Sequence, residues 1–221
     1  MEKHIKQLPQ DILALVYCAR DVSESTGLDA YLVGGFVRDL ILRRKNYDLD
    51  ITVEGPGIDF AQAFARKAGG RLVSHRRFGT ATVFLPARHK IDFATTRKER
   101  YPQPAALPEV SAGTLDDDLF RRDFAINTLA IGLSAPRFGR LIDRFHGCDD
   151  IRDGLVRVLH DLSFIDDPTR ILRCVRFEQR FGFSIEHHTL DLLKEASRSG
   201  SLSRVNPHRL RDELILILKE E

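Results

Sequence analysis

Two carboxylates separated by one residue stand in the segment "NYDLDITVE", at Asp48 and Asp50. The apolar and polar residues around them alternate with period two, which is typical of a half-buried β-strand. On such a strand both carboxylates point to one face, with their Cα atoms roughly 7 Å apart. Paired hard oxygen ligands suit Mg²⁺, whose charge would relieve the repulsion between the two acids. Asp48 and Asp50 are therefore candidate catalytic residues and metal ligands.

A third carboxylate follows in the segment "KIDFATT", which is predicted to form another short strand. Asp92 stands there between two apolar residues, so it belongs to the polar face of that strand. If the two strands are neighbours, Asp92 joins Asp48 and Asp50 at one site. A simpler alternative is that the Asp-x-Asp pair belongs to the solvated face of an edge strand and has no chemical role.

Two adjacent glycines, Gly34 and Gly35, precede the carboxylates in the segment "YLVGGFVRDL". Such a turn can present backbone N–H groups to a phosphate, and Arg38 lies one turn into the following predicted helix, within reach of a phosphate oxygen. The segment lacks the third spaced glycine of a dinucleotide fingerprint and the Gly-Lys-Ser/Thr of a Walker loop. Because both of these phosphate-binding motifs are absent, we expect the ligand to be a nucleoside triphosphate that is bound together with two metal ions.

The composition is that of a globular protein, since 221 residues with 43% hydrophobic content can build one sizeable domain or two small ones. A formal net charge of +2 combines with 30% charged residues, so any basic surface is local. Three widely spaced cysteines, Cys18, Cys148 and Cys174, argue against a disulfide framework and favour a reducing cytoplasm. We expect neither a signal peptide nor a membrane span, because polar residues interrupt the apolar runs.

The elements that must position these residues form an α/β region followed by a helical one. In the first region, helices are predicted over 11–26, 36–45 and 58–68, and strands over 30–33, 47–54, 71–75, 80–85 and 90–96. Residues 101–119 contain three of the nine prolines and little periodicity, so a loop is expected there. The last part is predicted to form helices over 166–183, 187–200 and 206–221, with Asn206 as an N-cap.

This pattern predicts an α+β fold, with a mixed sheet and flanking helices in residues 1–150 and an all-α region in 151–221. The chain ends directly after an apolar run, so we expect it to be a minimal or truncated version of a longer protein.

The predicted helix "PTRILRCVRFEQR" carries four arginines, at positions 170, 173, 176 and 180, within roughly a third of its circumference. A surface helix with solvated arginines is the simpler interpretation. No acidic residues are interleaved on this face, however, and like charges at helical spacing repel one another. A bound polyanion would relieve that repulsion.

Four segments together resemble the class II tRNA nucleotidyltransferase and bacterial poly(A) polymerase family, within the DNA polymerase β superfamily. "LVGGFVRDLIL" followed by "DLDI" is similar to the first signature of the family, and "DLFRRDFAINTLAI" to the second. "LIDRFHGCDDIRDGLVRVL" resembles the connecting segment, and "DDPTRILRCVRFEQRFGF" the nucleotide-selecting helix. The matches follow the family's order and extend from about Tyr31 to Phe183.

The resemblance implies roles for individual residues. Asp48 and Asp50 would hold the catalytic Mg²⁺ ions, and the nucleotide-binding residues would be Gly35, Arg38, Arg122, Asp167, Arg170, Arg173 and Arg176. Of these, Asp167 and Arg170 would address the base. Two positions depart from the family's pattern, because Ala125 replaces a common threonine and Asp166 a common glutamate.

The implied activity is addition of C, A or both to the 3′ end of tRNA, with ATP and/or CTP as substrates, the tRNA acceptor end as partner and pyrophosphate as product. Asp167 would accept a hydrogen bond from the exocyclic amine that cytosine and adenine share, while Arg170 donates to a ring acceptor. Guanine and uracil would leave these groups unpaired. CCA addition, CC addition, A addition and poly(A) synthesis stay open, as does a binding fragment without catalytic activity.

Overall fold

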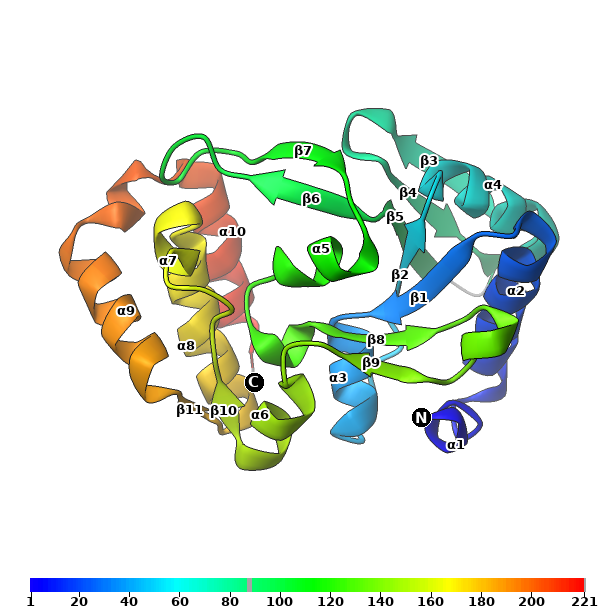
Figure 1. Cartoon of the computed structure of the whole chain (residues 1–221), viewed down its shortest axis with the longest axis horizontal. Coiled ribbons are helices and arrows are strands. Elements are labelled where there is room, and N and C mark those ends of the chain that lie inside the picture. The colour runs from blue at the N-terminus through cyan, green and yellow to red at the C-terminus, as the bar shows by residue number, and fades with distance from the viewer. Residues whose placement is uncertain (87–88, 221) are drawn as a thin grey trace. The chain divides into compact units, whose positions relative to one another are not determined.

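The computed structural model describes residues 1–86 and 89–220, which divide into two compact units (Figure 1). Unit 1 consists of residues 1–98, 111–120 and 127–144, and unit 2 of residues 99–110, 121–126 and 145–220. The chain therefore leaves unit 1 and returns to it twice before the last, mainly helical part begins.

A seven-stranded mixed sheet forms the centre of unit 1, in the order β3-β4-β5-β2-β1-β8-β9 (Figure 1). Strands β2 and β5 pair in parallel, whereas the other neighbours are antiparallel. The strands are β1 (Asp29–Val33), β2 (Leu49–Glu54), β3 (Arg71–His75), β4 (Thr80–Phe84), β5 (Lys90–Thr95), β8 (Leu129–Gly132) and β9 (Leu141–Asp143). The predicted α+β class and mixed sheet are thus confirmed.

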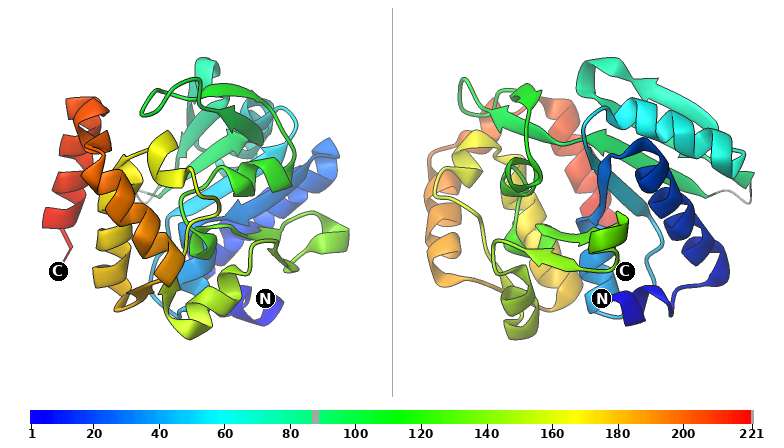
Figure 2. Two further views of the ribbon diagram at one scale, coloured as in Figure 1. Left: turned by 60° about the vertical axis from the view of Figure 1, so that its left-hand side comes forward. Right: turned by 45° about the vertical axis from the view of Figure 1, so that its right-hand side comes forward.

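One face of this sheet is apolar and is covered by helices α2 (Gln10–Thr26) and α4 (Gly57–Ala68), which lie side by side (Figure 2). Phe60 and Phe64 of α4 pack on Phe93 of β5, with ring centroids 5.9 and 5.1 Å apart. All three rings are fully buried, and burial of each large side chain contributes on the order of 2 kcal/mol. The opposite face is left for the polar side chains.

Two elements before residue 121 differ from the sequence predictions. The helix expected over 36–45 is α3 (Gly35–Ile41), and it ends early because Arg43 has a left-handed backbone with φ 56°. The loop expected over 101–119 contains β7 (Glu109–Ala112), which pairs with β6 (Arg97–Arg100), and then α5 (Leu115–Phe120). Strand β7 is exposed along its whole length, so it lacks the alternating pattern that would have predicted it. Shorter elements are α1 (Glu2–Ile5), η1 (Arg76–Phe78), η3 (Ala125–Asn127) and η4 (Ala135–Arg137).

Unit 2 is mainly helical, as predicted, and its helices α8 (Thr169–Phe181) and α10 (Pro207–Leu218) pack beside each other (Figure 2). Phe177 of α8 meets Phe124 edge to face, with ring centroids 5.7 Å apart, and Cys174 is fully buried. The side chain of Asn206 accepts a hydrogen bond from the His208 N–H, so the predicted N-cap is confirmed. The elements are α6 (Gly147–Asp153), β10 (Leu155–Val156), α7 (Ser163–Asp166), α8 (Thr169–Phe181), β11 (Ser184–Ile185), α9 (His187–Arg198), η5 (Ser201–Arg204) and α10 (Pro207–Leu218).

The three cysteines are free thiols, and burial raises the pKa of the Cys174 thiol to about 12. Among the helices of residues 1–86 and 89–220, none combines the length and the apolar character needed to cross a lipid bilayer. The compact parts of the chain are instead organised around the sheet of unit 1 and the helices of unit 2.

Candidate functional site

Asp48 and Asp50 lie at the start of β2, on the polar face of the sheet. Asp48 comes directly before the strand, and the order exposed, buried, exposed for residues 48, 49 and 50 shows the alternation expected of a strand. Strand β2 lies between β5 and β1, in the interior of the sheet. The alternative that these acids belong to an edge strand is therefore wrong.

Asp92 is beside this pair, because it is the register partner of Asp50 on the parallel strand β5. Its Oδ1 accepts a hydrogen bond of 2.5 Å from the hydroxyl of Thr82, and its Oδ2 lies 3.3 Å from the Lys90 ammonium. The charge of Asp92 raises the pKa of Lys90, with smaller contributions from Asp48 and Asp50. The three carboxylates thus share one electrostatic environment.

These acids suit a magnesium ion that also takes ligands from a substrate. In the described residues, no group of three or more His, Cys, Asp or Glu side chains is gathered closely enough to hold a metal ion by itself. Mg²⁺ is commonly bound by one or two carboxylates together with water and substrate phosphates, rather than by an all-protein cage. Asp48 and Asp50, both exposed, fit this kind of incomplete site.

The glycine turn between β1 and α3 depends on Gly34. This residue has φ 66° and ψ −129°, a backbone conformation that side chains exclude, and its N–H donates to the Leu129 carbonyl at 3.0 Å. Gly35 begins α3, where the first N–H groups of a helix have no partner within the helix. A Cβ atom at Gly35 would lie 3.5 Å from Arg38 Nη2, an ordinary contact distance. The backbone therefore requires glycine at position 34 more strongly than at position 35.

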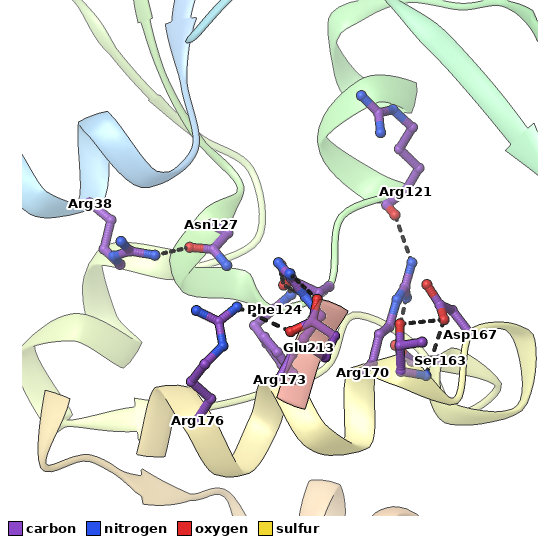
Figure 3. Close-up of polar contacts among 12 residues, drawn as sticks. Arg38, Arg121, Phe124, Asn127, Ser163, Asp167, Arg170, Arg173, Arg176 and Glu213 are labelled. Carbon is purple, nitrogen blue, oxygen red and sulfur yellow. Dashed lines mark hydrogen bonds and ion pairs between the residues drawn. The ribbon is translucent and has the colours of Figure 1, made fainter. Parts of the chain in front are cut away.

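Arg38 belongs to a hydrogen-bond network that is buried at Arg38 and Asp39 and leads to the candidate carboxylate Asp48 (Figure 3). Its side chain is 5% exposed, and its Nε and Nη2 lie 2.9 and 2.8 Å from Asp39 Oδ1, while Nη1 donates to Asn127 Oδ1 at 2.6 Å. Asp39 Oδ2 in turn accepts from the Asn46 amide at 2.7 Å. Asn46 Oδ1 then accepts from the backbone N–H of Asp48 at 3.0 Å. The network ties the loop before β2 to the body of unit 1.

Sequence reasoning missed the three residues that complete this network, namely Asp39, Asn46 and Asn127. Asn46 directly follows the helix predicted over 36–45, and the other two lie within the quoted motifs without a predicted role of their own. The dipeptide Arg38-Asp39 was the available signal, because a buried arginine needs an acidic partner.

In unit 2, Asp167 and Arg170 lie at the start of α8 and are both engaged with their own chain (Figure 3). Asp167 Oδ1 accepts from the Thr169 backbone N–H and hydroxyl at 3.1 and 2.6 Å, and Oδ2 lies 2.8 Å from Arg209 Nη2. Arg170 is 4% exposed and donates to the Ser163 hydroxyl at 2.7 Å and the Arg121 carbonyl at 2.8 Å. These contacts fix the orientation of both side chains.

The prediction of an uncompensated cationic face on α8 is wrong. Arg173 lies 2.6 Å from Asp123 Oδ2 and 2.9 Å from Glu213 Oε1, and the charge of Asp123 raises its pKa. Arg176 pairs with Glu213 at 3.3 Å and with Glu220 at 3.2 Å. Glu213 and Glu220 follow the arginines by up to 44 residues, and Asp123 precedes Arg173 by 50. The sequence pattern within the helix could therefore not predict these acidic partners.

Arg122, the remaining predicted residue, is half-buried and directly precedes Asp123. Of the two departures from the family's pattern, Ala125 is buried and Asp166 is half-buried. Burial raises the pKa of the Asp166 carboxyl. The predicted nucleotide residues of unit 2 are thus gathered around the N-terminal half of α8.

The sheet of unit 1, with acids on adjacent strands after a glycine turn, is the nucleotidyltransferase fold of the polymerase β type. The family model for the Poly A polymerase head domain matches residues 30–157, and the chain belongs to this family.

Among curated relatives, an A-adding tRNA nucleotidyltransferase of Geobacter sulfurreducens is 48% identical over 215 residues, which cover 97% of this chain and 24% of the relative. A solved CCA-adding enzyme in apo form II superposes with a TM-score of 0.93 at 47% identity, covering 98% of this chain and 51% of that one. The Thermotoga maritima CCA-adding enzyme complexed with tRNA gives 0.88 at 45% identity, covering 99% and 50%. The chain thus spans between a quarter and a half of the length of these proteins.

Proposed function

We propose that this chain is the catalytic and nucleotide-selecting part of a tRNA nucleotidyltransferase, which adds C, A or both to the 3′ end of tRNA. The observation that carries the proposal is the grouping of Asp48, directly before β2, with Asp50 of β2 and Asp92 of the adjacent strand β5. The names of the relatives, which are A-adding and CCA-adding enzymes, support the same reaction. The RNA 3′-hydroxyl would attack the α-phosphate of the nucleotide in line, and pyrophosphate would leave with the electron pair of the broken P–O bond.

Asp48 and Asp50 would hold Mg²⁺, which when bound supplies positive charge to the triphosphate and makes the attacking hydroxyl more acidic. The protein's own contribution is positioning. The network from Arg38 through Asp39 and Asn46 holds the backbone of Asp48 in place. We propose that the turn at Gly34 and Gly35 faces the triphosphate with its N–H groups, and that Arg38 supports this turn.

Base selection is proposed for Asp167 and Arg170. A carboxylate has about four acceptor sites and a guanidinium five donors, so the contacts described above leave capacity on both side chains for one base edge. Cytosine and adenine both present an exocyclic amine beside a ring acceptor, whereas guanine and uracil reverse this pattern. We further propose that Arg122, Arg173 and Arg176 support the nucleotide site.

One incorporation experiment distinguishes the possible activities. The 221-residue chain is incubated with tRNA lacking CCA, or ending in CC, and with each of the four triphosphates in turn. We expect addition of A to the CC end, because a relative at 48% identity is an A-adding enzyme. Addition of C to the shorter tRNA would indicate a CC- or CCA-adding enzyme, and repeated A addition a poly(A) polymerase. Binding without any incorporation would contradict the proposed reaction and indicate a binding fragment.

A further inference from the structure

A local excess of positive over negative charge accumulates in one stretch of unit 1. The 32 residues from 60 to 91 contain no Asp or Glu, although the whole chain has 32 acidic residues among 221. The same stretch contains seven basic residues, which are Arg66, Lys67, Arg71, Arg76, Arg77, Arg88 and Lys90. A local surplus of this kind is expected to attract a polyanion.

The structure places the middle of this stretch at an open edge of the sheet. Strand β3 is the edge strand, and η1 connects it to β4. Arg76 and Arg77 of η1 are exposed, and neither guanidinium has an acidic partner within residues 1–86 and 89–220. Their charge is therefore available to a ligand, in contrast to that of the arginines on α8.

Exposed aromatic rings lie among these arginines. Phe78 is 51% exposed, and the Arg77 guanidinium carbon lies 5.7 Å from its ring centroid. At the other end of β3, Arg71 lies 5.2 Å from the ring centroid of Phe84, which is 41% exposed and is its register partner. Aromatic faces alternating with cations are the arrangement that binds unpaired nucleotides, because the bases stack and the phosphates pair with the arginines. We call these five residues, Arg71, Arg76, Arg77, Phe78 and Phe84, the β3 edge patch.

The patch adjoins the row of catalytic acids through the sheet register. Thr82 of β4 is opposite Asp92, which is opposite Asp50, and Phe78 comes four residues before Thr82. At about 3.3 Å per residue and 4.8 Å per strand, Phe78 lies on the order of 15 Å from Asp50. A short single-stranded segment can span that distance.

We propose that the β3 edge patch binds the unpaired 3′ segment of the RNA whose end is extended at the carboxylates. The proposal rests on the proposed function for the identity of that RNA. A duplex conceals its base faces in the stack, so it would have no use for the exposed rings. An acidic protein surface would likewise pair with the arginines but leave Phe78 unused.

The test is binding of a fluorescent single-stranded RNA of about 12 nucleotides ending in CC, and of a duplex of equal length, measured by anisotropy over a range of salt concentrations. Arg76→Ala with Arg77→Ala should lower the slope of log affinity against log salt by about 1.4, because two phosphate contacts are lost. Phe78→Leu should weaken binding about five-fold or more without changing the slope, and Phe78→Trp should retain binding. The matched control, Lys3→Ala with Lys6→Ala, removes the same charge from α1 and the residue that directly follows it, and should bind normally.

Equal effects of the arginine variant and the control would overturn the proposal, as would equal affinity for single strand and duplex. Circular dichroism of each variant checks the fold. Binding needs no catalysis, so the two proposals fail separately. If the chain binds single-stranded RNA through the patch but transfers no nucleotide, the proposed reaction fails and the patch stands. If the patch variants transfer nucleotides and bind RNA as well as the original chain does, the proposed role of the patch fails and the proposed reaction stands.

Discussion

At the scale of single residues, the proposed chemistry depends on the candidate carboxylates and on the side chains that hold them in place. Asp48 stands at the end of a loop, so its position is set by what holds the loop. Asn46 makes two hydrogen bonds there, one to Asp39 and one from the Asp48 N–H. The carboxylates themselves could be predicted from their spacing, whereas the full network behind them could not, because Asn127 lies 89 residues from its partner Arg38.

Asn46→Ala removes both of these hydrogen bonds. We expect nucleotide incorporation to fall at least about ten-fold, with a loss of about 1 to 2 kcal/mol in the free energy of unfolding. Single-turnover kinetics and urea denaturation measure the two effects. Ser23→Ala is a matched control for stability, since it removes the 2.5 Å hydrogen bond from the Ser23 hydroxyl on α2 to the Leu28 carbonyl, and it should leave incorporation unchanged. Equal activity losses in the two variants would show that Asn46 acts only through stability.

His160 makes the stability of the fold depend on pH. Burial lowers the pKa of its imidazole, and the nearby charge of Arg170 lowers it further. Because the unfolded chain then binds a proton more readily than the native one, the free energy of unfolding should decrease as the pH falls through about 6.5. Urea titrations between pH 5 and 8 should show a smaller decrease for His160→Gln. His187→Gln, at a side chain that is 91% exposed, serves as the control, and an unchanged pH profile for His160→Gln would contradict this account.

At the scale of elements, α8 shows where pattern analysis succeeds and where it fails. The helix and its buried Cys174 were predictable from periodicity within one segment. Its bounds were not, because the helix spans Thr169–Phe181 rather than 166–183, and Asp167, which precedes a proline, is extended. The ionic environment was not, because Asp123 and Glu213 belong to other elements. In the same way, the period of β2 and β5 predicts which residues share a face, but only the fold shows that the two strands are neighbours. The exposed strand β7 has no period to detect.

Glu213 is the residue that joins α10 to α8, since its two oxygens lie 2.9 Å from Arg173 and 3.3 Å from Arg176. Glu213→Gln should reduce the free energy of unfolding by about 1 to 3 kcal/mol, less than the loss of an isolated buried pair, because Asp123 and Glu220 still compensate the two arginines. Denaturant unfolding provides the measurement. The exposed Glu195→Gln on α9 should change stability by less than about 0.5 kcal/mol. A similar small effect at Glu213 would mean that these ion pairs do not stabilise the unit.

At the scale of the whole molecule, the chain combines a sheet that gathers carboxylates with a helical unit that gathers arginines. Family membership follows from the match over residues 30–157, and the relatives extend well beyond the length covered here. The four sequence motifs, which follow the family's order, already indicated this class of protein, because they come from both units. The central claim is that Asp48 and Asp50 together make the nucleotidyl transfer possible.

The most direct test compares Asp48→Asn and Asp50→Asn with Asp59→Asn, an exposed acid in the first turn of α4. Single-turnover addition of a nucleotide to tRNA is measured for each variant with magnesium in excess. Both site variants should lose at least about 100-fold in rate, because several kcal/mol of transition-state stabilisation depend on the metal ligands, while their thermal midpoints stay close to that of the original chain. Asp59→Asn should react normally. A rate within a few-fold of the original chain in either site variant would contradict the account.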